Sequence, residues 1–353
     1  MPTQKCYLFK KEHIPEKAKY PVIDAHNHLW GDWSKIDETA ATMDQVGVKL
    51  YCDLTSNIRV EWVKGGYRFE PGDIDNFNRH CIKRHPGRFY GFTTANFARP
   101  IDRPLFTDID VFVEEARQTM RNHVKKGARG LKILKELGLH YRDGQGRLIK
   151  LDDPGLGPVW EEAAALGIPV LMHQSDCYGF FEPVLPENEH YESLLKYPSW
   201  SFADAKFPRK EELLARRDQV IRNHPRTTFM LPHVANFPEN LDYVGQLLDR
   251  HPNVFLDFSA RMDELGRQPY TARKFFLKYQ DRIYFGTDMP ASAAMYRCYF
   301  RFLETYDEYF VPPDYDGTFG RFRWHIYGLG LPDAVLKKIY YENVLRIVPG
   351  LAL

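Results

Sequence analysis

The chain of 353 residues has an ordinary globular composition, with 44% hydrophobic and 27% charged residues. Its 48 basic and 47 acidic side chains leave a formal charge of +1, which argues against a nucleic acid or a membrane surface as the main partner. Any charge selectivity must therefore be local to a pocket, and the expected partner is a small-molecule substrate.

Cysteine usage and the N-terminal segment indicate the compartment. The five cysteines are far apart and form no CxxC pair: Cys6, Cys52, Cys81, Cys177 and Cys298. This pattern disfavours a disulfide framework and favours a reducing compartment. The lysine-rich residues 1–20 lack the apolar core of a signal peptide, and no stretch reaches the ~18–20 apolar residues of a membrane span. We expect a cytoplasmic protein with an N-terminal arm (1–20) and a single domain (21–353); a homodimer is left open.

Short apolar runs recur along the chain and predict its fold. They are Pro21–Ala25, Val48–Leu54, Phe89–Ala95, Ala128–Leu134, Ile168–Met172, Thr228–Leu231, Val254–Phe258 and Arg282–Phe285. Several are apolar without alternation, which is typical of parallel strands buried on both faces. Eight such strands separated by helical stretches predict an α/β protein, a closed (β/α)8 TIM barrel of a single domain rather than an open sheet.

The segments between the runs predict helices and two long loops. The helices are expected at Asp110–Lys126, Gly157–Leu166, Lys210–His224, Asn240–Arg250, Pro269–Tyr279 and Pro332–Ile347. The loops, Asn96–Ile109 and Gln174–Arg209, follow the third and fifth strands. Loops of this length in a compact domain are usually functional, so we expect them to form the walls or lid of a pocket. The alternative is a surface excursion that packs on itself.

Histidines and an aspartate stand at the ends of four predicted strands. His26 and His28, at i and i+2, point to the same side of the first strand. A lone pair of this kind is often structural. Here the fifth strand also ends at His173, the sixth at His233 and the eighth at Asp288, on the rim where barrel enzymes keep their active sites. This coincidence favours one shared site.

The residue types in this set are those of a metal centre. We expect one divalent metal held by His26, His28, His173 and Asp288, most plausibly Zn²⁺, with Mn²⁺ or Fe²⁺ as options. Such an ion lowers the pKa of a bound water from about 15.7 to roughly 7. His233 and Asp288 are the predicted catalytic residues that hold or move its proton; His233 could instead be a core histidine.

The segments DAHNH, GLKIL, LMHQSD, LPHVAN and FGTDMP together resemble the amidohydrolase superfamily. More narrowly, they are similar to the amidohydrolase-related group that contains aminocarboxymuconate-semialdehyde decarboxylase. The resemblance covers residues 21–347 and implies a metal-dependent barrel enzyme. It matches His26, His28, His173 and Asp288 to metal ligands and His233 to the histidine that activates or orients metal-bound water. These motifs are specific to the superfamily but not to one reaction.

Three more residues are candidates for substrate binding. Lys132 stands where binuclear members of the superfamily carry a carbamylated lysine; we favour one metal and an uncarbamylated Lys132 that faces substrate, over a barrel lysine paired with Asp257. Arg261, just beyond the seventh strand, offers a guanidinium suited to a carboxylate. Asp176 could accept hydrogen bonds from substrate hydroxyls or cap its own loop.

The favoured function is hydrolysis of a small, polar, anionic cyclic ester or amide such as a sugar lactone. The segment DAHNHLWGDW is similar to the first-strand motif of sugar-acid lactonases within the superfamily. It lacks the proline that often follows the motif in the decarboxylases, and Gln174 rather than proline follows His173. The alternative is a metal-dependent non-oxidative decarboxylase, in which Arg261 would hold a carboxylate. A non-catalytic metal-containing barrel is a third reading, disfavoured because structural zinc sites are normally closed and away from the rim.

Overall fold

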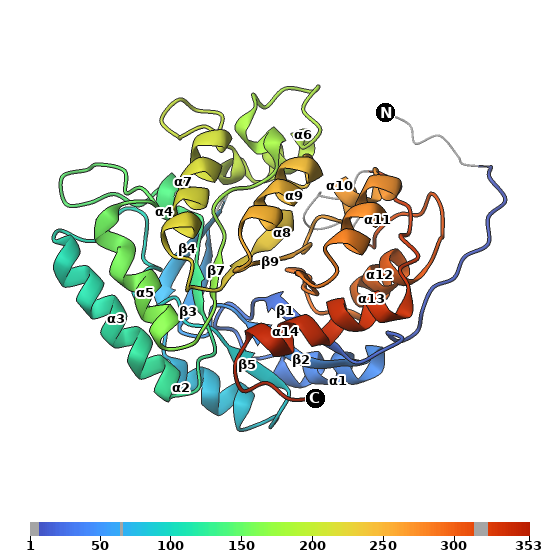
Figure 1. Cartoon of the computed structure of the whole chain (residues 1–353), viewed down its shortest axis with the longest axis horizontal. Helices are drawn as coiled ribbons and strands as arrows, with labels where there is room; N and C mark the ends of the chain where they lie inside the picture. The colour runs from blue at the N-terminus through green and yellow to red at the C-terminus, as the bar shows by residue number, and fades with distance from the viewer. Residues whose placement is uncertain (1–6, 64–65, 314–323) are drawn as a thin grey trace.

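The computed structural model describes residues 7–63, 66–313 and 324–353. Within them, eight parallel strands form the centre of the molecule and helices surround them (Figure 1). The strands are β1 (Val22–Asn27), β2 (Val48–Asp53), β5 (Phe89–Gly91), β6 (Leu131–Ile133), β7 (Val170–Met172), β8 (Phe229–Leu231), β9 (Val254–Asp257) and β10 (Ile283–Tyr284). Each falls on one of the predicted apolar runs, and all eight are buried except at Lys49.

The strands pair in chain order, as β1-β2-β5 and β6-β7-β8-β9-β10. Backbone contacts join these two sheets at both edges. Thr93, after β5, pairs in parallel with Leu131 of β6. At the other edge, the amide of Ala25 donates to the carbonyl of Phe285 at 3.0 Å. The predicted (β/α)8 barrel is confirmed.

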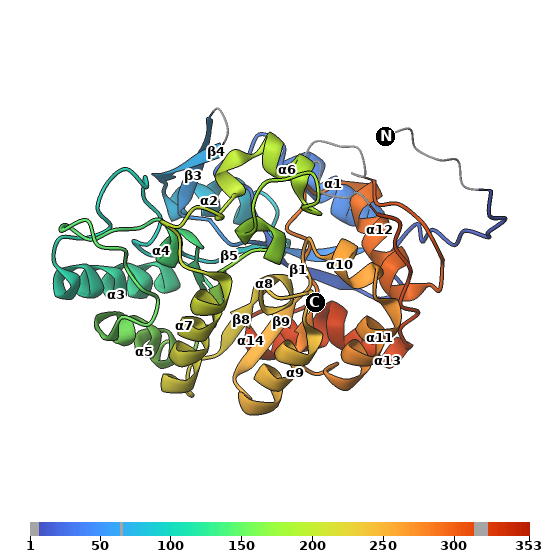
Figure 2. The ribbon, with the colours of Figure 1, turned by 90° about the horizontal axis from the view of Figure 1, so that it is seen from above.

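The helices lie on the outside of the barrel in both views (Figures 1 and 2). Their bounds are α1 (Ile36–Val46), α2 (Ile74–Phe77), η1 (Asn78–Ile82), α3 (Ile109–Lys125), α4 (Glu136–Leu139), η2 (Pro154–Leu156), α5 (Gly157–Ala165), η3 (Tyr178–Phe181), α6 (Tyr191–Lys196), η4 (Pro198–Trp200), α7 (Lys210–Asn223), α8 (Pro232–Ala235), α9 (Leu241–Arg250), α10 (Met262–Gly266), α11 (Pro269–Lys278), α12 (Ala293–Glu304), α13 (Asp333–Lys337), η5 (Lys338–Glu342) and α14 (Asn343–Ile347). The five predicted helices from 110 to 279 match α3, α5, α7, α9 and α11 to within one residue at each end.

The predicted helix Pro332–Ile347 is broken into three parts. A π-helical turn, η5, separates α13 from α14, so the chain gains a residue relative to a continuous α-helix. The turn brings Asn343 under the barrel, where its side-chain amide donates to the carbonyls of Gln280 and Ile283, both at 2.7 Å. These bonds fasten the last helix beside β10.

An apolar plug fills the lower barrel and leaves its upper rim to polar groups. The plug consists of buried side chains from all of the barrel strands except β6, closed from below by α14: Ile23, Ala25, Leu50, Cys52, Tyr90, Leu171, Met230, Phe255, Tyr284 and Val344. A full interior of this kind is typical of these barrels, in which the C-terminal ends of the strands carry the site.

Two excursions rise above the rim. One is a hairpin that sequence reasoning missed, β3 (Ile58–Val63) paired antiparallel with β4 (Gly66–Pro71). The other is the long segment 174–209, which contains η3, α6 and η4. Figure 2 shows β3, β4 and α6 on the same side of the barrel, and β4 contacts η4.

Other features bear on compartment and termini. Cys52, Cys81, Cys177 and Cys298 are buried free thiols, and Cys6 lies outside the described residues. Residues 7–20 form no helix or strand. In the part of the chain that the structure describes, none of the helices combines the length and apolar character needed to cross a bilayer.

Candidate active site

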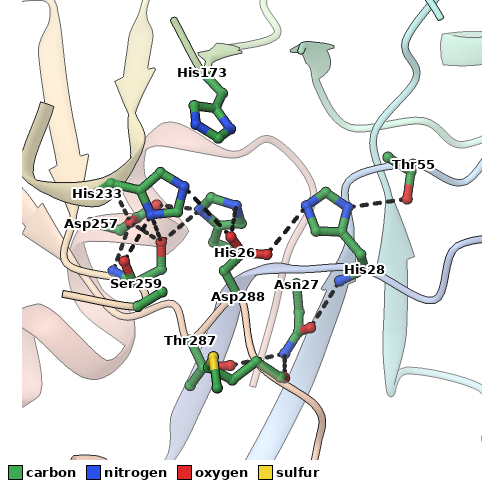
Figure 3. A network of polar contacts seen from close by, with 12 residues as sticks. His26, Asn27, His28, Thr55, His173, His233, Asp257, Ser259, Thr287 and Asp288 are labelled. Carbon is green, nitrogen blue, oxygen red and sulfur yellow. Dashed lines mark hydrogen bonds and ion pairs between the residues drawn. The ribbon is translucent and has the colours of Figure 1, made fainter. Parts of the chain in front are cut away.

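The predicted site residues gather at the C-terminal ends of the strands (Figure 3). His26 and His28 end β1, His173 follows β7, His233 follows β8 and Asp288 follows β10. Both His233 (φ 58°) and Asp288 (φ 49°) adopt the left-handed backbone conformation, which is rare for residues other than glycine. Such local strain, held by the surrounding fold, is typical of functional sites.

Asp257, at the end of β9, orients two of these histidines. Its Oδ2 lies 2.8 Å from Nδ1 of His26, and its Oδ1 accepts the backbone amide of His233 at 3.0 Å. The hydroxyl of Ser259 also donates to Oδ1, at 2.6 Å. Burial by itself raises the pKa of Asp257, but the His26 ring and these hydrogen bonds outweigh it and hold the pKa below its usual value. The group is therefore a carboxylate that accepts from His26.

The hydrogen bonds assign one tautomer to each histidine of the cluster. Nδ1 of His26 donates to Asp257. Nδ1 of His233 donates to the carbonyl of Ser259, at 2.8 Å. Nδ1 of His28 lies 3.1 Å from Oγ1 of Thr55, whose hydroxyl proton is already directed to Asp53 at 3.0 Å, so His28 must be the donor. In all three rings, Nε2 is left with a lone pair.

These three lone pairs converge on Asp288 (Figure 3). Nε2 of His26 lies 3.8 Å from Oδ2 of Asp288, and Nε2 of His233 lies 3.5 Å from the same oxygen. Nε2 of His28 lies 3.5 Å from Oδ1. Nε2 of His26 is buried and has no hydrogen-bond partner among the described residues. Acceptors that face one another without a proton between them fit a cation.

His26, His28 and Asp288 offer ligand atoms that all lie within 4.8 Å of one another, so these three could hold a metal ion. His173 stands outside this compact group. Its ring lies beside that of His233, with centroids 4.6 Å apart, but its Nε2 faces the carbonyl of Ser175 at 3.1 Å. Its place as the fourth ligand stays a prediction.

Burial favours the neutral form of His28, His173 and His233. Desolvation lowers the pKa of His28 and His233 well below the usual value of 6.5, and that of His173 to about 4. The positive charge of Lys132 adds to this effect at His28, and that of Arg261 adds to it at His233. Neutral imidazole is the form that binds metals and accepts protons.

Lys132, on β6, is fully buried under the site. Its Nζ has no hydrogen-bond partner among the described residues, and no ion pair with Asp257 is present there. Burial lowers its pKa to about 8, against the opposing pull of Asp288 and Asp257. The cavity described below is not lined by Lys132, so its predicted contact with substrate stays a prediction.

Arg261 and Asp176 meet each other at the rim. The guanidinium of Arg261 lies 3.4 Å from Oδ1 of Asp176, and its Nη1 donates to the carbonyl of Ala260 at 2.7 Å. The other oxygen of Asp176 accepts from Lys135. Burial raises the pKa of Asp176, but Lys135, His173 and Arg261 more than compensate and hold it well below its usual value. Lys135 was missed at the sequence level, although it stands three residues beyond Lys132.

A cavity of about 400 Å³ opens above this cluster. His28, His173, His233, Arg261 and Asp288 form its floor, and its walls carry the aromatic side chains Trp30, Trp62, Tyr67, Phe69, Phe180, Tyr197 and Trp200. Ring stacking extends from the floor into the wall, because the rings of His28 and Trp30 are parallel within 13° with centroids 3.9 Å apart. The cavity therefore offers flat apolar faces above a charged floor.

Of the two loops that were predicted to form the walls of the pocket, one lines the cavity and the other does not. Segment 174–209 supplies Phe180, Tyr197 and Trp200 to the wall. The prediction for Asn96–Ile109 is wrong, because its residues do not line the cavity. Phe97 instead packs edge-on against Phe112, with centroids 5.1 Å apart, on the outside of the barrel.

The β3–β4 hairpin provides the wall that this loop was expected to form. Val60, Trp62, Tyr67 and Phe69 of the hairpin all line the cavity. The alternation in Ile58–Val63, followed by a Gly-Gly pair, is a hairpin signal that could have revealed it.

A (β/α)8 barrel with a polar cluster on its C-terminal rim is the architecture of a barrel enzyme. The amidohydrolase family model matches residues 23–349. The chain belongs to this family and is an enzyme of the amidohydrolase superfamily, as its motifs predicted.

Solved structures share the fold at low sequence identity. The dihydroxybenzoic acid decarboxylase from a Polaromonas species, with bound manganese and the inhibitor 2-nitroresorcinol, is 15% identical with a TM-score of 0.52, over 93% of this chain and 96% of that one. The 2,6-dihydroxybenzoate decarboxylase from Rhizobium is 17% identical with a TM-score of 0.52, over 93% and 98%. An uncharacterized TIM-barrel protein from Bordetella bronchiseptica is 16% identical with a TM-score of 0.53, over 92% and 85%. None of the curated proteins compared with the chain matches it significantly.

Proposed function

We propose that this protein is a metal-dependent non-oxidative decarboxylase, a carboxy-lyase, of small aromatic acids. The observation that carries the proposal is the shape and chemistry of the cavity. Trp30, Trp62 and Phe69 offer flat faces that suit a planar ring, whereas Arg261 and Asp288 both line the floor. A ring with a carboxylate directed to the floor would match both features.

The solved relatives support this reading over the lactone hydrolase that the first-strand motif favoured. Two of them are decarboxylases of dihydroxybenzoates, molecules that combine an aromatic ring with a carboxylate. One departure from the decarboxylase pattern, Gln174 after His173, has a local explanation. The side-chain nitrogen Nε2 of Gln174 donates to the carbonyl of Leu137 at 2.8 Å.

The proposed metal is a divalent ion held by His26, His28 and Asp288, with His173 as the fourth ligand. The converging lone pairs support this assignment, since they lack a donor between them. Nitrogen and carboxylate ligands suit Mn²⁺ as well as Zn²⁺, and the Polaromonas enzyme contains manganese, so the sequence-level preference for zinc has no specific support. When bound, such an ion supplies Lewis acidity that polarises substrate oxygen atoms.

Asp288 is the proposed proton donor. Its side chain is 23% exposed, whereas those of His26, His28 and His233 are at most 5% exposed, so Asp288 is the group that meets substrate. Asp288 takes up a proton when substrate is bound and passes it to the ring carbon that bears the carboxylate. The bond between that carbon and the carboxylate then breaks, its electron pair returns to the ring, CO₂ leaves and Asp288 remains as a carboxylate.

His233 is proposed to accept a proton from Asp288 and to return it. Because Nδ1 of His233 is committed to the carbonyl of Ser259, its Nε2 can only accept from Asp288 and return the proton. Arg261 holds the substrate carboxylate before the bond breaks. Its existing contact with Asp176 keeps the guanidinium in the floor.

The proposal is tested by supplying the Mn²⁺-loaded protein with two panels, hydroxybenzoates and sugar lactones. We expect CO₂ release from at least one hydroxybenzoate and no ring opening of the lactones. In D₂O, the phenol product should carry deuterium at the carbon that lost CO₂. Lactone hydrolysis without CO₂ release would replace this function with the hydrolase.

A further inference from the structure

A second cluster of metal-ligating side chains lies where segment 174–209 meets α10. Cys177, His190 and Glu264 offer ligand atoms that all lie within 4.8 Å of one another. Each residue is buried, with at most 6% of its surface exposed. Cys177 precedes η3, His190 precedes α6 and Glu264 belongs to α10. The cluster thus joins the long excursion to the helix that follows β9.

Two buried polar atoms of this cluster have no hydrogen-bond partner among the described residues. The thiol of Cys177 donates a hydrogen bond to Oε1 of Glu264 at 3.0 Å. Oε2 of Glu264 has no hydrogen-bond partner among the described residues. The same holds for Nε2 of His190, whose nearest charged neighbour is Oε1 of Glu189 at 3.5 Å, and for Oε2 of Glu239. A buried polar atom left unpaired is unfavourable, so these atoms need a cation or another partner.

An acidic cavity of about 890 Å³ reaches this cluster at Glu264, the one member of the cluster that lines it. Its charged lining residues are five glutamates and one arginine: Glu182, Glu187, Glu189, Glu239, Glu264 and Arg267. A cavity lined by one sign of charge concentrates ions of the opposite sign. Arg267 is already paired with Glu189 at 2.8 Å, so the remaining carboxylates give the cavity a negative potential and an entry path for a cation.

Arg261 is a positive charge that acts on Cys177 and Glu264 from the floor side. Its Nη1 and Nη2 are engaged by the carbonyl of Ala260 and the carboxylate of Asp176. Two anions, the carboxylate of Glu264 and a thiolate at Cys177, outweigh it once a metal displaces the thiol proton into solvent.

We propose that Cys177, His190 and Glu264 form a second metal site, for Zn²⁺, separate from the one at the barrel rim. A sulfur, a nitrogen and an oxygen ligand suit this borderline-soft ion, which accepts four ligands, and water or a cavity glutamate can complete the set. The site fastens segment 174–209 to α10. Because Cys177 is adjacent to Asp176 and Glu264 lies three residues beyond Arg261, the ion also fixes the pair on the floor of the main cavity.

Co²⁺ substitution tests this site without an activity assay. The full chain is freed of metal by a chelator and titrated with Co²⁺. A cobalt–thiolate bond gives a near-ultraviolet charge-transfer absorption, and the rim site, which contains no cysteine, cannot produce it. We expect this absorption in the wild type, its loss in Cys177→Ser and its retention in Cys81→Ser, a matched buried thiol in η1. A double variant, His26→Ala with His28→Ala, should retain it.

The wild-type spectrum decides even where a variant fails to fold. Absence of the thiolate absorption in the wild type at saturating Co²⁺ overturns the proposal, and so does an absorption that survives Cys177→Ser. As a second measurement on the wild type, Zn²⁺ should slow alkylation of Cys177 at least tenfold, as located by peptide mapping. Equal alkylation with and without Zn²⁺ also overturns it.

Discussion

Nδ1 of His26 lies 2.8 Å from Oδ2 of Asp257, and this contact directs Nε2 of His26 toward Asp288. The other oxygen of Asp257 accepts the backbone amide of His233. One carboxylate at the end of β9 therefore sets the orientation of two histidines that come from β1 and the turn after β8. Groups that orient ligands in this way control metal affinity.

The first prediction concerns this carboxylate. Asp257→Asn keeps the size of the side chain but removes the negative charge that fixes the tautomer of His26. Metal affinity should fall roughly 10–100-fold, as titration with Mn²⁺ followed by electron paramagnetic resonance would measure. The matched control is Asp249→Asn on the surface, where Asp249 pairs with Lys278 at 3.0 Å. An unchanged metal affinity in Asp257→Asn would show that the hydrogen bond between His26 and Asp257 does not orient the His26 ring.

The second prediction separates a ligand from a proton carrier. His233→Ala should keep its metal and lose about 10²–10⁴ in turnover, because it removes a general acid–base group. His173→Ala should lose both metal and turnover. Elemental analysis and rate measurement on the two variants check this. If His233→Ala empties the site, His233 is itself a ligand; if its turnover is near normal, the residue is structural.

The third prediction concerns Arg261. Arg261→Ala should raise KM for a carboxylate substrate about 10–100-fold, the effect of one or two lost charge-assisted hydrogen bonds. The inhibition constant of a neutral analogue that binds but is not converted should change much less. Arg267→Ala, whose guanidinium pairs with Glu189 away from the floor, serves as the control. An equal loss of affinity for charged and neutral compounds in Arg261→Ala would refute the role of Arg261 in binding the substrate carboxylate.

The fourth prediction is a pH effect on stability. Burial, together with the charge of Lys135, lowers the pKa of His140 from 6.5 to about 4, and its ring packs edge-on against Phe202 and Phe207. The unfolded chain therefore takes up a proton near pH 6.5 and the folded chain only near pH 4, so stability falls as the pH drops through this window. The loss amounts to about 3 kcal/mol.

His140→Gln should remove that part of the pH dependence. Urea denaturation of this variant at pH 7 and at about pH 4.5 should show a smaller difference in unfolding free energy than the wild type shows. His80→Gln, at an exposed position, should behave as the wild type does. A wild-type difference that persists in His140→Gln would assign the effect to other groups.

The barrel could be predicted because its strands are buried on both faces and read as apolar runs. Segment 168–172, IPVLM, is an example, and β7 lies within it. Helix α1 was missed although Ile36, Ala40, Met43 and Val46 follow a helical period. The segment is short, and its charged residues interrupt the apolar pattern. The π-helical turn in the last helix has no sequence signature, since it depends on the position of Asn343 under β10.

The site could be predicted in part, for a physical reason. Parallel strands bring their ends to one rim, so His26, His28 and Asp288 had to meet there. Side-chain pairing above the rim does not follow from strand order. Arg261 and Asp176 were each expected to contact substrate. Both line the cavity, and the structure also pairs them with each other, which the sequence did not predict. That contact depends on the path of a 36-residue excursion, which no local pattern specifies.

The central claim is a metal ion at His26, His28 and Asp288, and crystallography with Mn²⁺ tests it most directly. Crystals of the full chain soaked in Mn²⁺ should give an anomalous difference peak within about 2.0–2.3 Å of Nε2 of His26, Nε2 of His28 and a carboxylate oxygen of Asp288. The same map shows whether His173 turns to complete the set. An active enzyme whose map has no peak there, and in which water alone contacts these three atoms, would contradict the account.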